Sequence, residues 1–234
     1  MDQKTLGLTG NQLKMIALVS MTIDHMGLIL FGQYRLLRII GRLAFPIFAW
    51  MIAEGCRHTR SMGKYLGSMV AVAALCQVVY FVAMGSLEMC IMVTFSLSVS
   101  ICWLIRLARE KKSVLFGIPA FIGVLAAFFI TDILPKLLRG VAYFNVDYGF
   151  LGVMLPVALY LCKDKKLQLP VAAVLLSAMA LWSGWEIQWF SLLSLPLLAL
   201  YNGQRGKWKL KWFFYVYYPA HLVALWAILL WRLR

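Results

Sequence analysis

Three ionisable side chains lie inside the first long apolar run of the chain: Lys14, Asp24 and His25. Ionisable groups are costly in hydrocarbon, so they normally face a polar cavity or a partner. An imidazole in such a place can act as a general base on a hydroxyl or an amine, with a carboxylate from elsewhere fixing its tautomer. Adjacent helix residues point about 100° apart, so Asp24 is not expected to bond His25 directly. The alternative is that His25 is only a hydrogen-bond link between helices.

Later apolar runs carry further candidates. Arg42 needs an anion, which Asp24 or Asp147 could supply, or it meets a ligand's phosphate or a developing negative charge. Because Arg42 lies near the start of its run, it could instead extend to the outer surface. His221 follows Tyr217 by four residues, which places both on one helical face. These residue types indicate proton transfer or binding of an anion.

The second apolar run ends in a basic segment. Pro46 is expected to bend this run, and its end carries Glu54, Arg57, Arg60 and, shortly after, Lys64. The three cations beside a glycine could bind phosphate groups. An ordinary basic loop of a membrane protein is the simpler interpretation from composition alone. No Walker loop, dinucleotide fingerprint, nucleophile motif or metal-binding helix is present in the sequence.

The composition is that of a polytopic membrane protein. Of the 234 residues, 63% are hydrophobic and 14% are charged, whereas a soluble domain is nearer half apolar and a quarter charged. The first apolar run lacks a cleavage-site pattern and is expected to be retained. The net charge of +14 fits basic loops better than nucleic-acid binding. The five cysteines are scattered, which favours free thiols over a metal site or disulfides.

The apolar runs predict an all-α transmembrane bundle of about nine spans, forming a single domain over residues 1–234. A span needs about 17–25 apolar residues, and the candidates are 12–32, 37–56, 64–84, 89–106, 113–131, 146–162, 168–183, 187–201 and 212–231. The seventh and eighth candidate spans are short. They are expected to form a tight hairpin or to enter the membrane without crossing it fully. The longest connection is expected at 132–145.

The basic residues also predict the orientation of the spans. Most of the 23 Lys and Arg residues fall in the N-terminal segment and in every second connection, which places the N-terminus in the cytoplasm. Lys14 is then near the cytoplasmic entrance. His25 lies roughly 16 Å further along the helix axis, in the outer half of the membrane. Arg42 enters from the outer side at a similar depth.

Taken together, these motifs resemble the TraX family of bacterial membrane proteins. The matching segments follow one another along nearly the whole chain, at residues 23–27, 41–48, 54–55, 59–60, 147–149, 152, 201–206, 214–215 and 218–221. In the fourth span Thr94 matches the family, whereas the Asn that typically precedes that Thr is missing. The family is named for a protein required for N-terminal acetylation of conjugative pilin. It is similar to a wider superfamily of integral-membrane acyltransferases.

The resemblance implies transfer of an acetyl or short acyl group from cytoplasmic acyl-CoA to an amine or hydroxyl of an extracytoplasmic glycan or protein. In the wider superfamily a basic residue precedes a His by eleven positions, as Lys14 precedes His25. By this resemblance His25 is the general base or acyl relay. The resemblance also implies that the protein lies in the cytoplasmic membrane of a bacterium. The residues implied to orient it or to stabilise the oxyanion are Asp24, Arg42, Asp147 and His221. Those implied to bind acetyl-CoA are Lys14, Glu54, Arg57, Arg60, Lys64 and Thr94.

A proton-coupled transporter or flippase is the alternative, because intramembrane His, Arg and carboxylate residues suit that function too. Against it, the two halves of the chain share no charge pattern of the kind an inverted repeat would leave. No metal site is predicted.

Overall fold

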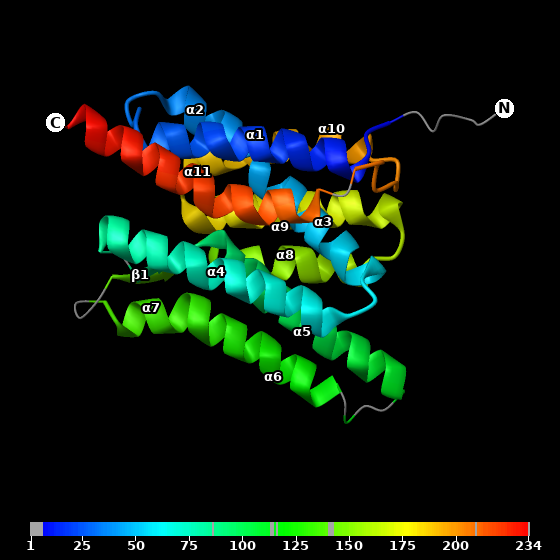
Figure 1. Cartoon of the computed structure of the whole chain (residues 1–234). Coiled ribbons are helices and arrows are strands. Elements are labelled where there is room, and N and C mark those ends of the chain that lie inside the picture. The colour runs from blue at the N-terminus through cyan, green and yellow to red at the C-terminus, as the bar shows by residue number, and fades with distance from the viewer. Residues whose placement is uncertain are drawn as a thin grey trace. The chain divides into compact units, whose positions relative to one another are not determined.

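Helices make up two compact units (Figure 1). The structure is a computed structural model that describes residues 7–85, 87–112, 115, 117–139, 143–208 and 210–233. The first unit contains Met1–Met51 and Asp164–Arg234, and the second contains Ile52–Lys163. The boundary falls inside helix α3 (Ala44–His58). The prediction of one domain over the whole chain stays a prediction.

The first unit is built around α1 (Gly10–Ile29). Thr9 caps this helix in a reciprocal arrangement with Gln12, which satisfies two backbone donors of its first turn. Helices α2 (Arg35–Gly41) and α11 (Lys211–Arg232) both contact α1 and lie beside it in Figure 1. The other elements of the unit are α9 (Lys165–Ser183), the 3₁₀ helix η3 (Glu186–Leu193) and α10 (Ser194–Ala199).

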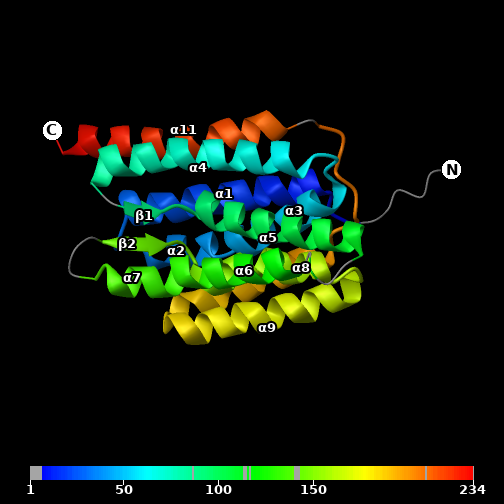
Figure 2. The same ribbon diagram turned by 90° about the horizontal axis from the view of Figure 1, so that it is seen from below.

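The second unit packs helices around α5 (Ile91–Lys111), which contacts α4, α6 and α8. The helices are α4 (Met62–Met84), α6 (Gly117–Phe128), the π-helix η2 (Phe129–Ile133), α7 (Leu134–Leu137) and α8 (Gly149–Leu161). Strands β1 (Leu87–Met89) and β2 (Phe144–Val146) pair in parallel, with Glu88 opposite Asn145 (Figure 2). The all-α prediction missed this pair, because three-residue strands are too short to show alternation.

The protein is a helical membrane protein. Among the described residues, six helices are long and apolar enough to cross a membrane, and 149–161 and 186–199 form shorter apolar helices. Helix α1 is not among the six, although it covers most of the predicted first span. The count of nine spans therefore stays a prediction. The fifth run continues through η2 and α7, so the predicted connection at 132–145 begins later than expected, after Leu137.

The second predicted span is interrupted where Arg42 lies. Helix α2 ends at Gly41 and α3 starts at Ala44. Pro46 explains the position of the break, because its ring nitrogen has no hydrogen to donate to the carbonyl of Arg42, four residues earlier. Pro46 lies in the first turn of α3, where backbone amides have no intrahelical acceptor. Its missing N–H group therefore does not destabilise α3. The bend expected from Pro46 therefore comes at Arg42 and separates the two helices.

Candidate active site

Two glycines allow α1 and α2 to approach closely. A side chain on Gly41 would collide with the Asp24 carboxylate. A Cβ atom on Gly27 would lie 2.8 Å from Cβ of Leu37 and 3.4 Å from Cδ of Arg38. Because neither glycine has a side chain, the contact between the helices has room for one carboxylate and the stem of an arginine. Both glycines belong to the segments that carry the family resemblance.

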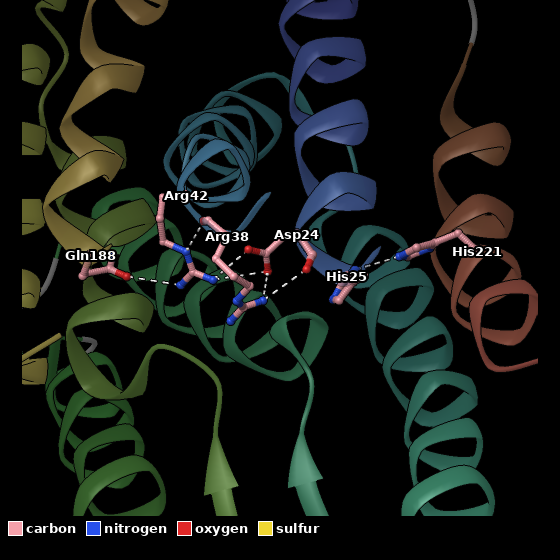
Figure 3. A network of polar contacts seen from close by, with 6 residues as sticks. All are labelled: Asp24, His25, Arg38, Arg42, Gln188 and His221. Atoms are coloured by element: carbon pink, nitrogen blue, oxygen red, sulfur yellow. Dashed lines mark hydrogen bonds and ion pairs between the residues drawn. The ribbon is translucent and has the colours of Figure 1, made fainter. Parts of the chain in front are cut away.

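Asp24 binds two arginines in this space (Figure 3). Arg38 Nη1 lies 2.6 Å from Asp24 Oδ2, and Arg42 Nη2 lies 2.9 Å from Oδ1 and 3.2 Å from Oδ2. The side chains are 15% exposed for Asp24, 16% for Arg38 and 7% for Arg42. A carboxylate buried to this extent requires such partners, because desolvating an isolated charge is costly. Of the two anions expected for Arg42, Asp24 is the one that binds it within this unit.

Helix η3 contributes the other wall of the cluster. Gln188 Oε1 accepts a hydrogen bond from Arg42 Nη1 at 3.4 Å. The ring of Trp185 lies 6.0 Å from Cζ of Arg38 and 5.9 Å from Cζ of Arg42, within the range of a cation–π contact. Figure 3 shows Gln188 approaching Arg42 on the side away from His25. We refer to Asp24, Arg38, Arg42 and Gln188 as the arginine cluster.

His25 bonds to His221, with His25 Nδ1 lying 2.9 Å from His221 Nε2. The two residues come from α1 and α11, and Figure 3 shows their rings facing each other. As expected from helix geometry, Asp24 and His25 point to different partners although they are adjacent in sequence. His25 therefore lies between the arginine cluster and α11, and its ring partner is a second imidazole rather than a carboxylate.

The hydrogen-bond partners determine which nitrogens carry protons when both rings are neutral. A peptide carbonyl can only accept, so Nδ1 of His221, at 3.0 Å from the carbonyl oxygen of Tyr217, must donate. Nε2 of a neutral His221 is then an acceptor, and Nδ1 of His25 must donate to it. The remaining nitrogen of His25, Nε2, carries the lone pair. It makes no hydrogen bond to the described residues. A proton taken up there leaves the other bonds of the pair intact.

Tyr217 holds His221 in this orientation. Its ring stacks on the imidazole with centroids 5.3 Å apart and planes at 10°. The Thr22 hydroxyl donates to the carbonyl of Leu18 at 2.8 Å, so its oxygen accepts from the Tyr217 hydroxyl, also at 2.8 Å. The predicted shared face of Tyr217 and His221 is confirmed. This face fixes the second imidazole and, through it, the tautomer of His25.

Lys14 lies on the same helix as His25, eleven residues earlier. Its Nζ is 5.9 Å from the centroid of Phe214 on α11. The preceding turn of α1 is bound by the loop at 201–206: the amides of Gly10 and Asn11 donate to the carbonyls of Gln204 and Arg205 at 2.8 and 2.9 Å. Segment 201–206 of the family resemblance therefore has a structural role: it binds the first turn of α1.

The remaining predicted site residues belong to the second unit. The Thr94 hydroxyl is fully buried and donates to the carbonyl oxygen of Asp147 at 2.6 Å. Arg57 binds Glu54 and the carbonyls of Leu159 and Cys162.

Two further predicted residues of this unit, Arg60 and Lys64, are exposed. The pairing of Asp147 with Arg42 and the binding of CoA by these residues stay predictions. Among the described residues, no group of three His, Cys, Asp or Glu side chains could hold a metal ion.

Sequence reasoning missed Arg38 and Gln188. The spacing of four residues between Arg38 and Arg42 is that of one helical face and is the signal that could have indicated a pair. Gln188 follows Arg42 by 146 positions and carries no local signal. Only the folded chain brings it to the cluster.

Comparison with known proteins supports the family resemblance. The family described as TraX protein matches residues 9–229. The probable fimbrial assembly protein FimC, serogroup H1, of Dichelobacter nodosus is 24% identical over 239 residues, which cover 92% of this chain and 93% of that protein. An uncharacterized protein of Rickettsia prowazekii (strain Madrid E) is 50% identical over 38 residues, or 16% of this chain and 15% of that protein. No solved structure matches.

Proposed function

The chain belongs to the TraX family, and on that premise we propose that it transfers an acetyl or short acyl group from acyl-CoA to an amine or hydroxyl of an acceptor. The observation that carries the proposal is the hydrogen-bonded pair of His25 and His221, which leaves the lone pair of His25 Nε2 available as a base. An unpaired basic nitrogen beside a buried arginine cluster is the combination that acyl transfer uses.

In the proposed reaction, His25 Nε2 accepts the proton of the acceptor's hydroxyl or amine. The acceptor oxygen or nitrogen attacks the thioester carbonyl carbon, and a tetrahedral oxyanion forms. The C–S bond then breaks, and the proton held on His25 passes to the CoA thiolate, which leaves as the free thiol. His221 accepts the hydrogen bond of the imidazolium at Nδ1 throughout. Arg42 orients the site or stabilises the oxyanion through its positive charge, and Asp24 holds Arg42 in position.

The acyl donor is proposed to reach His25 from the cytoplasmic end of α1, where Lys14 lies. Arg60 and Lys64 are exposed and available to phosphate groups, and Arg57 and Glu54 are proposed to take part in binding CoA, as the family resemblance implies. The acceptor is proposed to be an extracytoplasmic glycan or protein, reached from the opposite side of a bacterial cytoplasmic membrane. The relative named as a fimbrial assembly protein supports a protein acceptor.

The test is transfer of radiolabelled acetyl from acetyl-CoA by the purified protein in liposomes, with a panel of peptide amines and amino sugars. We expect transfer to at least one acceptor. General-base catalysis contributes about 10²–10⁴-fold, so His25→Ala should reduce the rate by about 100-fold or more. Arg35→Gln, which removes an exposed arginine of α2, is the matched control and should leave the rate unchanged. A wild-type rate in His25→Ala would exclude the proposed role of His25.

A proton-coupled transporter is the second candidate, because a hydrogen-bonded pair of imidazoles can also pass a proton. Proton uptake into proteoliposomes driven by a candidate solute, without acetyl transfer, would favour it.

A further inference from the structure

Two side chains of the arginine cluster, Arg38 and Gln188, have hydrogen-bond donors that no described residue accepts. Arg38 uses Nη1 for both Asp24 contacts, to Oδ2 at 2.6 Å and to the backbone oxygen at 3.3 Å. Its Nε and Nη2 have no acceptor among the described residues. Nε2 of Gln188 also has no partner there, although Gln188 is only 4% exposed. A buried donor left without an acceptor costs about 1–3 kcal/mol, so the state of Gln188 Nε2 needs an explanation.

These donors belong to one polar wall. Gln188 points into the arginine cluster, since its Oε1 bonds to Arg42. Ser191 follows Gln188 by one turn of the 3₁₀ helix, so both lie on one face of η3. Its hydroxyl is fully buried and likewise has no partner in the described part of the chain. Trp185 covers the guanidinium groups of Arg38 and Arg42.

The nearby carboxylate does not satisfy this wall. Glu186 is the residue after Trp185, but it pairs with Arg35 at 2.7 Å, and both side chains are well exposed. Asp24 already shares its two carboxylate oxygens between Arg38 and Arg42. What would complete the wall is a group that offers several acceptor oxygens and carries negative charge, as phosphate and carboxylate do.

We propose that Arg38 and Gln188 form a subsite for a phosphate or carboxylate group of the acyl acceptor. This rests on the proposed function. The subsite lies at the level of His25, because Asp24, which Arg38 binds, is its neighbour in α1. The phosphates of CoA are separated from its thioester by the whole pantetheine arm, so a donor whose thioester reaches His25 places them elsewhere. The subsite therefore belongs to the acceptor, whose anionic group would orient its amine or hydroxyl toward His25.

The test measures binding rather than turnover. The full-length protein in dodecyl maltoside is titrated with sn-glycerol 3-phosphate, and its melting temperature is recorded. Glycerol at the same concentrations and sodium chloride at the same ionic strength serve as controls. We expect a saturable rise with glycerol 3-phosphate only. Loss of a charge-assisted hydrogen bond should weaken the apparent affinity about tenfold or more in Arg38→Gln.

Three variants make the result specific. Gln188→Glu places a negative charge in the subsite while keeping the shape of the side chain, and it should lose the response without unfolding. Arg35→Gln should respond as the wild type does. His25→Ala should also keep the response, because it leaves the subsite intact, so the subsite can be present even if acetyl transfer is not observed.

Three results would overturn the proposal. One is no response in the wild type, and another is an equal response in wild type and Arg38→Gln. The third is stabilisation by phosphatidylglycerol in nanodiscs but not by glycerol 3-phosphate, which would assign the subsite to a lipid headgroup instead of an acceptor.

Discussion

The ionisable side chains around His25 in the first unit bind one another, whereas the buried hydroxyl groups of the second unit bind the backbone. Asp24 binds Arg38 and Arg42, and His25 binds His221. In the second unit the hydroxyl of Ser98 donates to the carbonyl of Val153 at 2.8 Å, and that of Thr94 donates to the carbonyl of Asp147. These contacts join α5 to α8 and to the segment before it, and each occupies the hydroxyl donor that it involves.

The difference separates structural from functional polarity in this protein. Asp132 illustrates the structural kind: it lies in the π-helix η2, accepts from the backbone amide of Phe150 at 3.1 Å and so caps the first turn of α8. The His25 pair and the arginine cluster instead leave His25 Nε2, Arg38 Nη2 and Gln188 Nε2 without partners among the described residues. Polar atoms that have no hydrogen-bond partner among the described residues are available to bind a substrate.

The largest effect is expected from Asp24→Asn. It removes the only charge that Asp24 offers to Arg38 and Arg42 while keeping its shape, and breaking a buried ion pair typically costs about 3–5 kcal/mol. Unfolding of the purified protein in detergent measures the loss, with Arg35→Gln as the exposed-pair control, for which about 0–1 kcal/mol is expected. A loss below 1 kcal/mol would mean that the arginine cluster does not stabilise the first unit.

An intermediate effect, on rate rather than stability, is expected from His221→Phe. The phenyl ring still stacks on Tyr217, but His25 Nδ1 loses its hydrogen-bond acceptor. The proton of neutral His25 is then no longer held on Nδ1 and can lie on either ring nitrogen. Loss of about 1–3 kcal/mol corresponds to about a tenfold to hundredfold lower acetyl-transfer rate. His221→Gln, whose Oε1 can accept from His25, should recover part of it. Equal acetyl-transfer rates in the Phe and Gln variants would show that His221 contributes packing but no hydrogen bond that matters for the reaction.

The smallest effect is expected from Ser98→Ala in the second unit. The variant removes one buried hydrogen bond between α5 and α8 and should cost about 1 kcal/mol of stability. The acetyl-transfer rate per folded molecule should not change. A variant of Ser98 that slowed transfer without loss of stability would break the distinction between the two units.

Much of the first unit's site could be predicted from single residues. Lys14, Asp24, His25, Arg42 and His221 stand out because ionisable groups are rare in apolar runs. Asp24 is one of the two protein anions that the sequence predicts for Arg42, beside a ligand's phosphate and the outer surface, and the approach of α1 to α2 brings Asp24 to Arg42 within the first unit.

What could not be predicted depends on long-range geometry. The bond between His25 and His221 joins residues 196 positions apart, and the sequence offered a carboxylate as an equally reasonable partner for the imidazole. The 3₁₀ conformation of η3, which places Gln188 and Ser191 on one face, leaves no distinct periodicity in eight residues. The π-helix at Phe129–Ile133 continues the fifth run past residue 131, where the loss of apolar character predicts its end.

The most direct test of the central claim is an experimental structure of the protein in nanodiscs with CoA bound. The proposed function predicts that the pantetheine arm runs along α1 from Lys14 and that the thiol lies beside His25 Nε2, at about the 3–3.5 Å separation of reacting groups. It also predicts that the bond between His25 Nδ1 and His221 Nε2 is kept. A thiol that ends away from His25, or a His25 whose Nε2 is bonded to another protein group in the complex, would contradict the role of His25 as the base in acyl transfer.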